Sequence, residues 1–309
     1  MYRGTITDVP EIEVGHAHDL KAGTGCTVII CRKGAVAGVD VRGAAPGTRE
    51  TDLIRPGNLV DRVHGILLTG GSAFGLAAAD GVMKYLEEQG VGFETSSVKV
   101  PIVAGAVLYD LEYGSAKVRP DTAMGYQACI NASKDNSLQG SVGAGAGATV
   151  GKVIGMKGSM KSGIGTASIV LPGGIVVGAI AAVNAFGDVM DPNTGKILAG
   201  AVCPKTGQFL NTVDYILSNG GKYDFAGMNT TIGVVATNAA LTKEQANRVA
   251  AIAHDGLART IRPVHTMMDG DTLFTLSTGD IQGDMTMIGC AAVEVVSRAV
   301  VNAVSFQKL

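Results

Sequence analysis

Apolar and polar positions along this chain follow two different periods. Residues 65–69 (GILLT) form a short apolar run, and after a glycine turn apolar side chains recur at helical spacing. This pattern predicts a strand followed by a helix. Two more helices are predicted late in the chain. One covers 243–260, where Thr242 and Gln245 can form a capping box, and the other runs from Met287 nearly to the last residue.

The middle of the chain predicts buried strands. Three apolar runs, 160–171, 175–187 and 231–239, are rich in β-branched and small residues. The stretch 172–174 (PGG) separates the first two, so each is too short to span a bilayer, and together they predict a hairpin. No repeat or linker interrupts the pattern. We therefore expect one α/β domain over 1–309, with helices covering sheets.

Composition narrows the expected partners. With 309 residues, of which 46% are hydrophobic, the chain can bury a large core. Charged residues make up only 17%, the net charge is −2 and no run of like charges occurs, so neither nucleic acid nor a membrane is an expected partner. Small molecules are the expected ligands. Glycine, with 44 residues, has roughly twice its usual share, which predicts frequent turns and close backbone packing.

The cysteines and the first residues predict a cytoplasmic location. The five cysteines are scattered without a C-x-x-C pair, as is typical of thiols in a reducing compartment. The opening residues MYRGTITDVPEIEVG contain no apolar core of a secretory signal. His16 and His18 have only Asp19 as a nearby companion, so we expect no metal site there.

Two glycine-rich segments resemble a nucleophile elbow and a dinucleotide-binding motif, but their spacing fits neither. Ser72 stands at a strand-to-helix turn, but Phe74 replaces the last glycine of a nucleophile elbow, so Ser72 is expected to be a helix N-cap. The loose dinucleotide pattern fits Gly143, Gly145 and Ala148, but the next residues predict a strand where that motif needs a helix. A glycine-lined turn close to another backbone or a substrate is the better interpretation.

The strand predicted over 231–239 raises a chemical question, because Asn229, Thr230 and Thr231 stand at its start. Threonine favours strands and asparagine favours turns, so a purely structural reason is available. A catalytic reason is also available, since a threonine hydroxyl becomes a nucleophile once its own α-amino group is freed to act as the base. Free α-amines titrate near about 7.7–8.0, so a useful fraction is neutral at physiological pH.

Six further segments carry a family resemblance. They are GAAPGTRETDL (43–53), LLTGGSAFGLAAADGV (67–82), VPIVAGAVLYDL (100–111), RPDTAMGYQA (119–128), GAGAGATVGK (143–152) and VNAFG (183–187). In this order, and over nearly the whole chain, they resemble the self-processing L-aminopeptidase/D-amidase-esterase family. That family includes β-peptidyl aminopeptidases and the endo-type 6-aminohexanoate-oligomer (nylon-oligomer) hydrolase.

The resemblance implies a cleavage site. In the aminopeptidase branch the chain is cut between Gly and Ser, six residues before an A-T-[DN]-A segment. That segment begins here at Ala236, so the implied cut falls between Asn229 and Thr230, and Thr230 is the implied nucleophile. The Asn-Thr pair, with DGDTLF further on, is similar to the nylon-oligomer branch and leaves the substrate open. Thr231 is the rival nucleophile if the cut falls one bond later.

The supporting residues are implied one at a time. Asp269 and Asp271 stand where the aminopeptidases have a Ser-x-Glu pair, and strand alternation puts both carboxylates on one face, where they could hold the α-ammonium and hydroxyl of Thr230. Asn184 matches an asparagine that lines the oxyanion hole, and Tyr109 matches an assisting tyrosine. Without the resemblance, the acid pair would be interpreted as a surface turn and the other two as core polar groups.

A buried lysine is also implied. Lys152 closes a small-residue run in G-K-V, as in the nylon-oligomer branch, and Lys161 is the alternative. Taken alone, Lys152 would be a solvated strand end. Tyr126 is a weaker match than Tyr109 for the tyrosine.

The resemblance implies a four-layer α/β/β/α sandwich of the N-terminal-nucleophile type, similar to the ornithine acetyltransferases, without metal or organic cofactor. It implies a hydrolase of small peptides or amide oligomers, cut into 1–229 and 230–309 and assembled as a tetramer of αβ units. Two alternatives remain open. One is an acyltransferase on the same fold, which passes the acyl group to an amine, and the other is an uncut, non-enzymatic binding protein.

Overall fold

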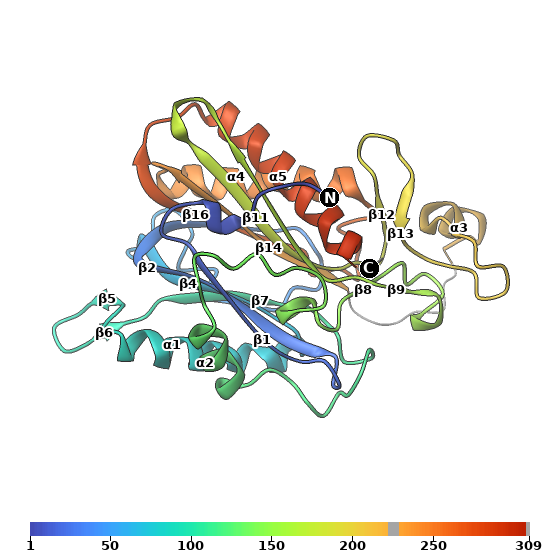
Figure 1. Ribbon diagram of the computed structural model, residues 1–309, viewed down its shortest axis with the longest axis horizontal. Helices are drawn as coiled ribbons and strands as arrows, with labels where there is room; N and C mark the ends of the chain where they lie inside the picture. The colour runs from blue at the N-terminus through green and yellow to red at the C-terminus, as the bar shows by residue number, and fades with distance from the viewer. Residues whose placement is uncertain (222–228, 307–309) are drawn as a thin grey trace.

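The structure, a computed structural model, describes residues 1–221 and 229–306. Its four layers are a helix layer, two sheets and a second helix layer, in that order from top to bottom in Figure 1. The expected α/β/β/α sandwich is therefore confirmed. One outer layer consists of α4 (Lys243–Thr260) and α5 (Met285–Ser305), and the other consists of α1 (Ala78–Glu88) and α2 (Thr122–Ile130). The sheet beneath α4 and α5 contains β10 (Ile164–Val170), β11 (Val176–Asn184), β14 (Thr230–Ala239) and β16 (Thr272–Ile281).

One long strand, β2 (Thr24–Val41), joins the two sheets. It pairs with β4 through Cys26–Ile30 and with β16 through Val36–Val41. The hydrogen-bonded order is β10-β11-β14-β16-β2-β4-β7-β3, with β1 added on β2. The second sheet thus contains β1 (Glu13–Asp19), β4 (Arg62–Thr69), β7 (Val103–Val107) and β3 (Thr48–Arg49).

Side-chain alternation along the strands creates the three apolar layers between them. In β14, Ile232 and Val234 face the other sheet, whereas Val235 faces α4 and α5. In β2, Ile29 belongs to the layer between the sheets and Ile30 faces α1 and α2. The site described below lies where the layer between the sheets reaches the ends of the strands.

Most of the predicted elements are present. The β10–β11 hairpin turns at Pro172–Gly174, and α4 is opened by a capping box of Thr242 and Gln245. The prediction of a strand after the glycine-rich run that begins at Gly143 is wrong in its extent. The run forms a 3-10 turn over Gly143–Gly145, and only Thr149–Val150 (β8) is extended, paired with β9 (Met160–Lys161).

Smaller elements complete the fold. By length and composition alone α5 could cross a membrane, but 72% of its apolar window is buried in the structure, as expected of a core helix. The short elements are β5 (Phe93–Glu94), β6 (Lys99–Val100), β12 (Asp188–Met190), β13 (Ile197–Ala199), β15 (Ile261–Arg262) and α3 (Thr212–Ser218).

Candidate active site

Thr230 is the first residue of β14, and its side chain points between the two sheets. β14 lies between β11, which runs antiparallel to it, and β16, which runs parallel. Because Ile232 and Val234 face the other sheet, Thr230 shares their face and Thr231 faces the helices. Only 4% of Thr230 is exposed, so a substrate can reach its hydroxyl only through a cavity beside it.

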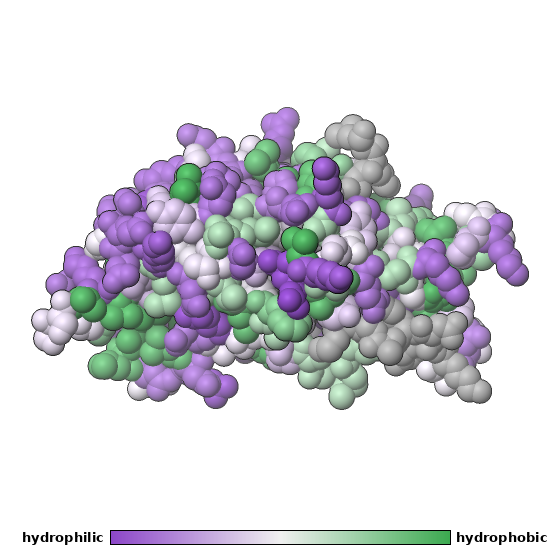
Figure 2. Space-filling view, turned by 90° about the horizontal axis from the view of Figure 1, so that it is seen from below, coloured by the Kyte–Doolittle hydropathy of each residue, from purple (hydrophilic) through white to green (hydrophobic). Residues whose placement is uncertain are grey.

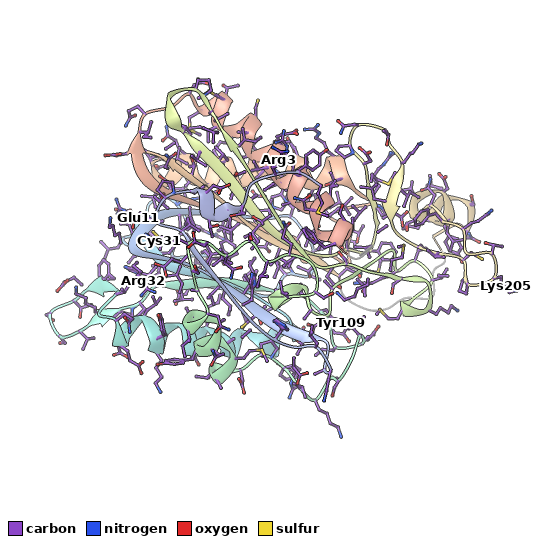
Figure 3. The ribbon with its side chains drawn as sticks, viewed as in Figure 1. Arg3, Glu11, Cys31, Arg32, Tyr109 and Lys205 are labelled. Carbon is purple, nitrogen blue, oxygen red and sulfur yellow. The ribbon has the colours of Figure 1, made fainter. Side chains whose placement is uncertain are left out.

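A cavity of about 150 Å³ supplies that space. Its walls come from the opposite sheet: the segment before β3, the turn after β4 and the end of β7. Figure 3 shows Tyr109 at the end of the sandwich near β8. A small group of a substrate can reach the Thr230 hydroxyl there. Besides Thr230, the lining residues are Ala45, Pro46, Gly47, Ser72, Ala73, Val107, Leu108 and Tyr109.

The carbonyl group that precedes Thr230 is held from two sides. The Gly270 backbone N–H donates to the Asn229 carbonyl oxygen at 2.8 Å, and the Thr230 hydroxyl donates to the same oxygen. A Cβ atom at Gly270 would lie 2.6 Å from the Ala45 carbonyl oxygen and 2.8 Å from Thr230 Oγ1, so glycine permits this close approach. A fixed N–H aimed at a carbonyl oxygen is the geometry that stabilises a developing oxyanion.

Asp271 holds the residue after Thr230. Its Oδ1 accepts the Thr231 backbone N–H at 2.6 Å, and its Oδ2 accepts the His265 backbone N–H at 3.1 Å. The His265 ring Nδ1 lies 2.8 Å from the same Oδ2. Phe274 of β16 faces the sheet interface, so Asp271, an odd number of residues away, lies on the helix side of the sheet. Asp271 therefore positions the backbone and does not contact the Thr230 hydroxyl.

Asp269 is buried beside this backbone. Its Oδ2 accepts from the Thr266 backbone N–H at 2.8 Å and from the Thr266 hydroxyl at 2.5 Å. Burial, followed by the nearby Asp271 carboxylate, raises the pKa of Asp269 to about 6. The carboxyl is thus a buried group that titrates near neutral pH, a property common at catalytic sites.

Asn184 pairs directly with Thr230 across β11 and β14. Its Oδ1 accepts from Lys152 Nζ at 2.7 Å and from the Thr149 backbone N–H at 3.1 Å. Its Nδ2 donates to the Tyr109 carbonyl oxygen at 2.8 Å. Four residues expected in one site, Thr230, Asn184, Lys152 and Tyr109, are thus brought together by β11, β14 and two loops.

Lys152 is only 2% exposed, and its burial lowers the pKa of its ammonium to about 7, with Asp269 the leading opposing charge. Lys161 has a similarly lowered pKa of about 7, again because of burial, but its ammonium donates to the carbonyl oxygens of Gly145, Ala148 and Ser162. Lys161 therefore ties the glycine-rich run together, and the geometry favours Lys152 as the site lysine.

The structure corrects the expectation for Ser72 and places Tyr126 outside the site. Ser72 is not an N-cap: Gly71 precedes the 3-10 helix Ser72–Ala77, no side chain caps it, and Ser72 adopts a left-handed φ of 54° beside the Thr230 cavity. Tyr126 lies on α2, where its hydroxyl donates to Glu88 at 2.6 Å, far from these contacts.

Sequence reasoning missed His265 and Thr266, which anchor the two aspartates. They stand three to six residues before Asp269 and Asp271, and polar groups at such short separations often form hydrogen bonds with a carboxylate in the same loop. This spacing could have indicated both residues. His265 also packs edge-on against His254 of α4, with ring centroids 4.9 Å apart. Within residues 1–221 and 229–306, no three His, Cys, Asp or Glu side chains come together as a set of metal ligands.

The chain matches known proteins over almost its whole length. The model of peptidase family S58 matches residues 4–308. An uncharacterized aminopeptidase of Mycobacterium leprae is 44% identical over 330 aligned residues, which cover 97% of this chain and 90% of that protein. A 6-aminohexanoate-oligomer endohydrolase of Kocuria sp. is 35% identical, over 89% of this chain and 75% of that protein. The resemblance inferred from the sequence is confirmed.

A solved structure agrees in fold. The L-aminopeptidase D-Ala-esterase/amidase of Ochrobactrum anthropi, described as a variant of the Ntn hydrolase fold, matches with a TM-score of 0.72. The match covers 97% of this chain and 85% of that one at 19% identity, so it supports the fold alone.

The lowered pKa of Lys152 predicts a pH-dependent contribution to stability. The folded-state pKa of about 7 lies below the ordinary 10.5, so this contribution is present above pH 10.5 and is lost as the pH falls through 7. Lys152→Met has no ammonium to titrate, so its free energy of unfolding lacks this loss. Between pH 10 and pH 6 the free energy of unfolding of the variant should therefore rise relative to that of the parent, on the order of a few kcal/mol.

Urea unfolding at both pH values, on chains that also carry Thr230→Val to exclude cleavage, measures the difference. Lys134→Met, at an exposed lysine, is the matched control and should show no such trend. If the free energies of unfolding of Lys152→Met and its parent differ by the same amount at both pH values, the lowered pKa of Lys152 is wrong.

Proposed function

Since this chain belongs to peptidase family S58 and hydrolyses amide bonds, we propose that it does so with Thr230 as an N-terminal nucleophile that it frees by cutting itself. One observation carries the proposal. Thr230 is the first residue of a core strand and lines a cavity, and the Gly270 N–H donates to the preceding carbonyl oxygen at 2.8 Å. The same contacts serve cleavage of the chain first and of a substrate afterwards.

Self-cleavage begins when Thr230 Oγ1 attacks the carbonyl carbon of Asn229 and gives up its proton. The charge that develops on the Asn229 oxygen lies beside the Gly270 N–H. Collapse breaks the C–N bond, the nitrogen leaves as the protonated α-amine, and the acyl group remains on Oγ1 as an ester. Water hydrolyses the ester and leaves an α-chain of 1–229 and a β-chain of 230–309.

Substrate hydrolysis repeats this chemistry between molecules. The freed α-amine of Thr230 takes the hydroxyl proton while Oγ1 attacks the substrate carbonyl, and the amine product leaves with that proton. Water then releases the acyl group. Asp271 fixes the strand start through Thr231, Asp269 stabilises the new ammonium, and Asn184 with Lys152 and Tyr109 borders the reacting carbonyl.

The substrates are small peptides or amide oligomers. The names of the relatives, an aminopeptidase and a 6-aminohexanoate-oligomer endohydrolase, support this class, and the cavity of about 150 Å³ suits a small group of such a substrate. We place the enzyme in the cytoplasm, since all five cysteines are free; cell fractionation tests this.

The first prediction from the proposed function concerns the nucleophile. The parent should separate into fragments of about 23 and about 8 kDa, by residue count from 31.4 kDa, with the smaller one beginning Thr-Thr-Ile-Gly. Thr230→Val should stay a single chain because it has no hydroxyl, and Thr230→Ser should be cut. Denaturing electrophoresis and N-terminal sequencing give the result.

Thr231→Val is the matched control, because it makes the same change one residue later on the opposite face of β14. It should be cut as the parent is. A fragment beginning Thr-Ile-Gly-Val would assign the nucleophile to Thr231, and cleavage of Thr230→Val at the same bond would rule out self-processing.

The second prediction concerns Asp269. Asp269→Asn removes the charge that stabilises the new ammonium, so turnover on a peptide-like anilide should fall on the order of 100-fold or more. Asp188→Asn is the matched control. Asp188 is also buried and accepts the Ala201 and Thr212 backbone N–H groups, so this variant should lose stability without losing kcat. Equal kcat in the two variants would remove Asp269 from the mechanism.

The third prediction concerns assembly, for which we propose a tetramer of αβ units. Hydrophobic side chains gather in Figure 2 at the end of the molecule where β5 and β6 lie in Figure 1. Phe93 and Val98 of that end are 38% and 56% exposed. A second copy could cover such a surface. Sedimentation should give a particle several times 31.4 kDa, and a particle of 31.4 kDa at micromolar concentration would contradict the proposal.

A further inference from the structure

The residue before the cleavage site has a buried polar side chain without polar contacts. Asn229 is 0% exposed, and neither Oδ1 nor Nδ2 of its side chain has a hydrogen-bond partner among residues 1–221 and 229–306. Buried polar atoms are nearly always paired, because an unpaired one gives up its water and gains no hydrogen bond in return. The space that holds the Asn229 side chain therefore suits an apolar group better than an amide.

The backbone of Asn229 is fully paired. Its N–H donates to the Met268 carbonyl oxygen, and its carbonyl oxygen accepts from the Gly270 N–H, both at 2.8 Å. These two bonds place Asn229 beside Asp269 as in a parallel sheet. The chain is thus held here by its backbone alone, with no help from the Asn229 side chain.

The face of the strand start that carries the Asn229 side chain is short of polar partners. By strand alternation this side chain points away from Thr230 and to the same side as Thr231. In the part of the chain that the structure describes, the buried Thr231 hydroxyl also has no hydrogen-bond partner. Asp271 lies on that side, but its two oxygens already accept from the Thr231 N–H and from His265. Three polar side-chain atoms at two neighbouring positions are therefore unpaired.

Self-cleavage and substrate hydrolysis pass through the same kind of ester. In the first, the acyl group of Asn229 is bonded to Thr230 Oγ1 beside the freed α-amine. In the second, the acyl group of the substrate is bonded to the same oxygen beside the same amine. The substrate residue that supplies the carbonyl must therefore bind close to where Asn229 lies before the cut.

We propose that the place of Asn229 is the acyl subsite of the processed enzyme, and that it selects an uncharged, apolar side chain about the size of leucine. The inference rests on the proposed function of Thr230. The substrate residue takes over the backbone contacts, so that its N–H donates to the Met268 carbonyl oxygen and its carbonyl oxygen accepts from the Gly270 N–H. Asparagine is a poor occupant because its amide gains no hydrogen bond there, which favours departure of the α-chain end after the cut.

The uncut precursor tests the subsite without any enzyme activity. In chains that carry Thr230→Val, Asn229→Leu exchanges an unpaired amide for an apolar group of similar size, so the equilibrium constant of unfolding in urea should fall about tenfold. Asn238→Leu is the matched control on the same strand. Asn238 is 8% exposed, its Oδ1 accepts from the Val176 N–H at 2.8 Å and its Nδ2 donates to the Gly174 carbonyl oxygen at 3.1 Å, so this variant should lose stability.

A second pair of variants needs no extra room, because leucine is thicker at Cγ than asparagine. Asn229→Ala removes an unpaired amide, whereas Asn238→Ala removes a paired one. Asn229→Ala should therefore lower the urea midpoint less than Asn238→Ala does. A loss as large at Asn229 as at Asn238 in this pair would overturn the inference.

Processed protein tests the specificity with the p-nitroanilides of L-leucine, L-asparagine and L-aspartate, which share the α-amine and the leaving group. We expect kcat/KM to be highest for the leucine compound and about tenfold lower for the asparagine compound, whose amide is left unpaired. The aspartate compound should be the slowest, because an unpaired carboxylate is costlier to bury than an amide.

Hydrolysis of the asparagine compound at least as fast as the leucine compound would overturn the inference and leave Thr230 in its role. If the chain is cut but hydrolyses none of the three anilides, the proposed function itself fails, and the inference falls with it.

Discussion

The alternation of side chains at the start of β14 is the constraint on which the site depends. Two adjacent threonines must point to opposite faces of the strand, so one enters the layer between the sheets and the other faces α4 and α5. Thr230 faces the cavity, while the Thr231 N–H is held by Asp271 from the helix side. One strand end is thus fixed from the helix side, and its Thr230 hydroxyl faces the cavity on the other side, where it donates to the Asn229 carbonyl oxygen.

Burial of charge gives this site its chemical character. A chain with 17% charged residues places Lys152, Asp269 and Asp271 at 2% exposure or less within one region. Desolvation moves the pKa of Lys152 down to about 7 and that of Asp269 up to about 6, so both groups titrate near neutral pH. The cost is offset by short hydrogen bonds to Asn184 and Thr266, because buried charges without partners are strongly destabilising.

Close backbone approach explains part of the high glycine content. The Asp269 carbonyl accepts the Ala45 N–H at 2.9 Å, and a Cβ atom at Gly43 would overlap the Asp269 backbone. A Cβ atom at Gly270 would lie 2.6 Å from the Ala45 carbonyl oxygen and 2.8 Å from Thr230 Oγ1. The segment of residues 269–271 therefore packs closely between the residues that follow β2 and the start of β14, where the Gly270 N–H donates to the Asn229 carbonyl oxygen.

Local signals in the sequence determined the elements and the register of the strand. The Thr242–Gln245 capping box, the 172–174 turn and the apolar run of 231–239 act over a few residues, and each is present in the structure. The family resemblance, applied through the segment that begins at Ala236, implied a cut between Asn229 and Thr230, and Thr230 is the first residue of that strand. Only the tertiary structure decided which groups surround Thr230. In the structure the Lys152 ammonium donates to Asn184, whereas the Lys161 ammonium donates to backbone carbonyl oxygens. His265 contacts Asp271, and Ser72, expected to be a helix cap, lines the cavity beside Thr230. These contacts connect residues on different strands and loops, and periodicity gives the face of a side chain but not the partner that packing brings to it.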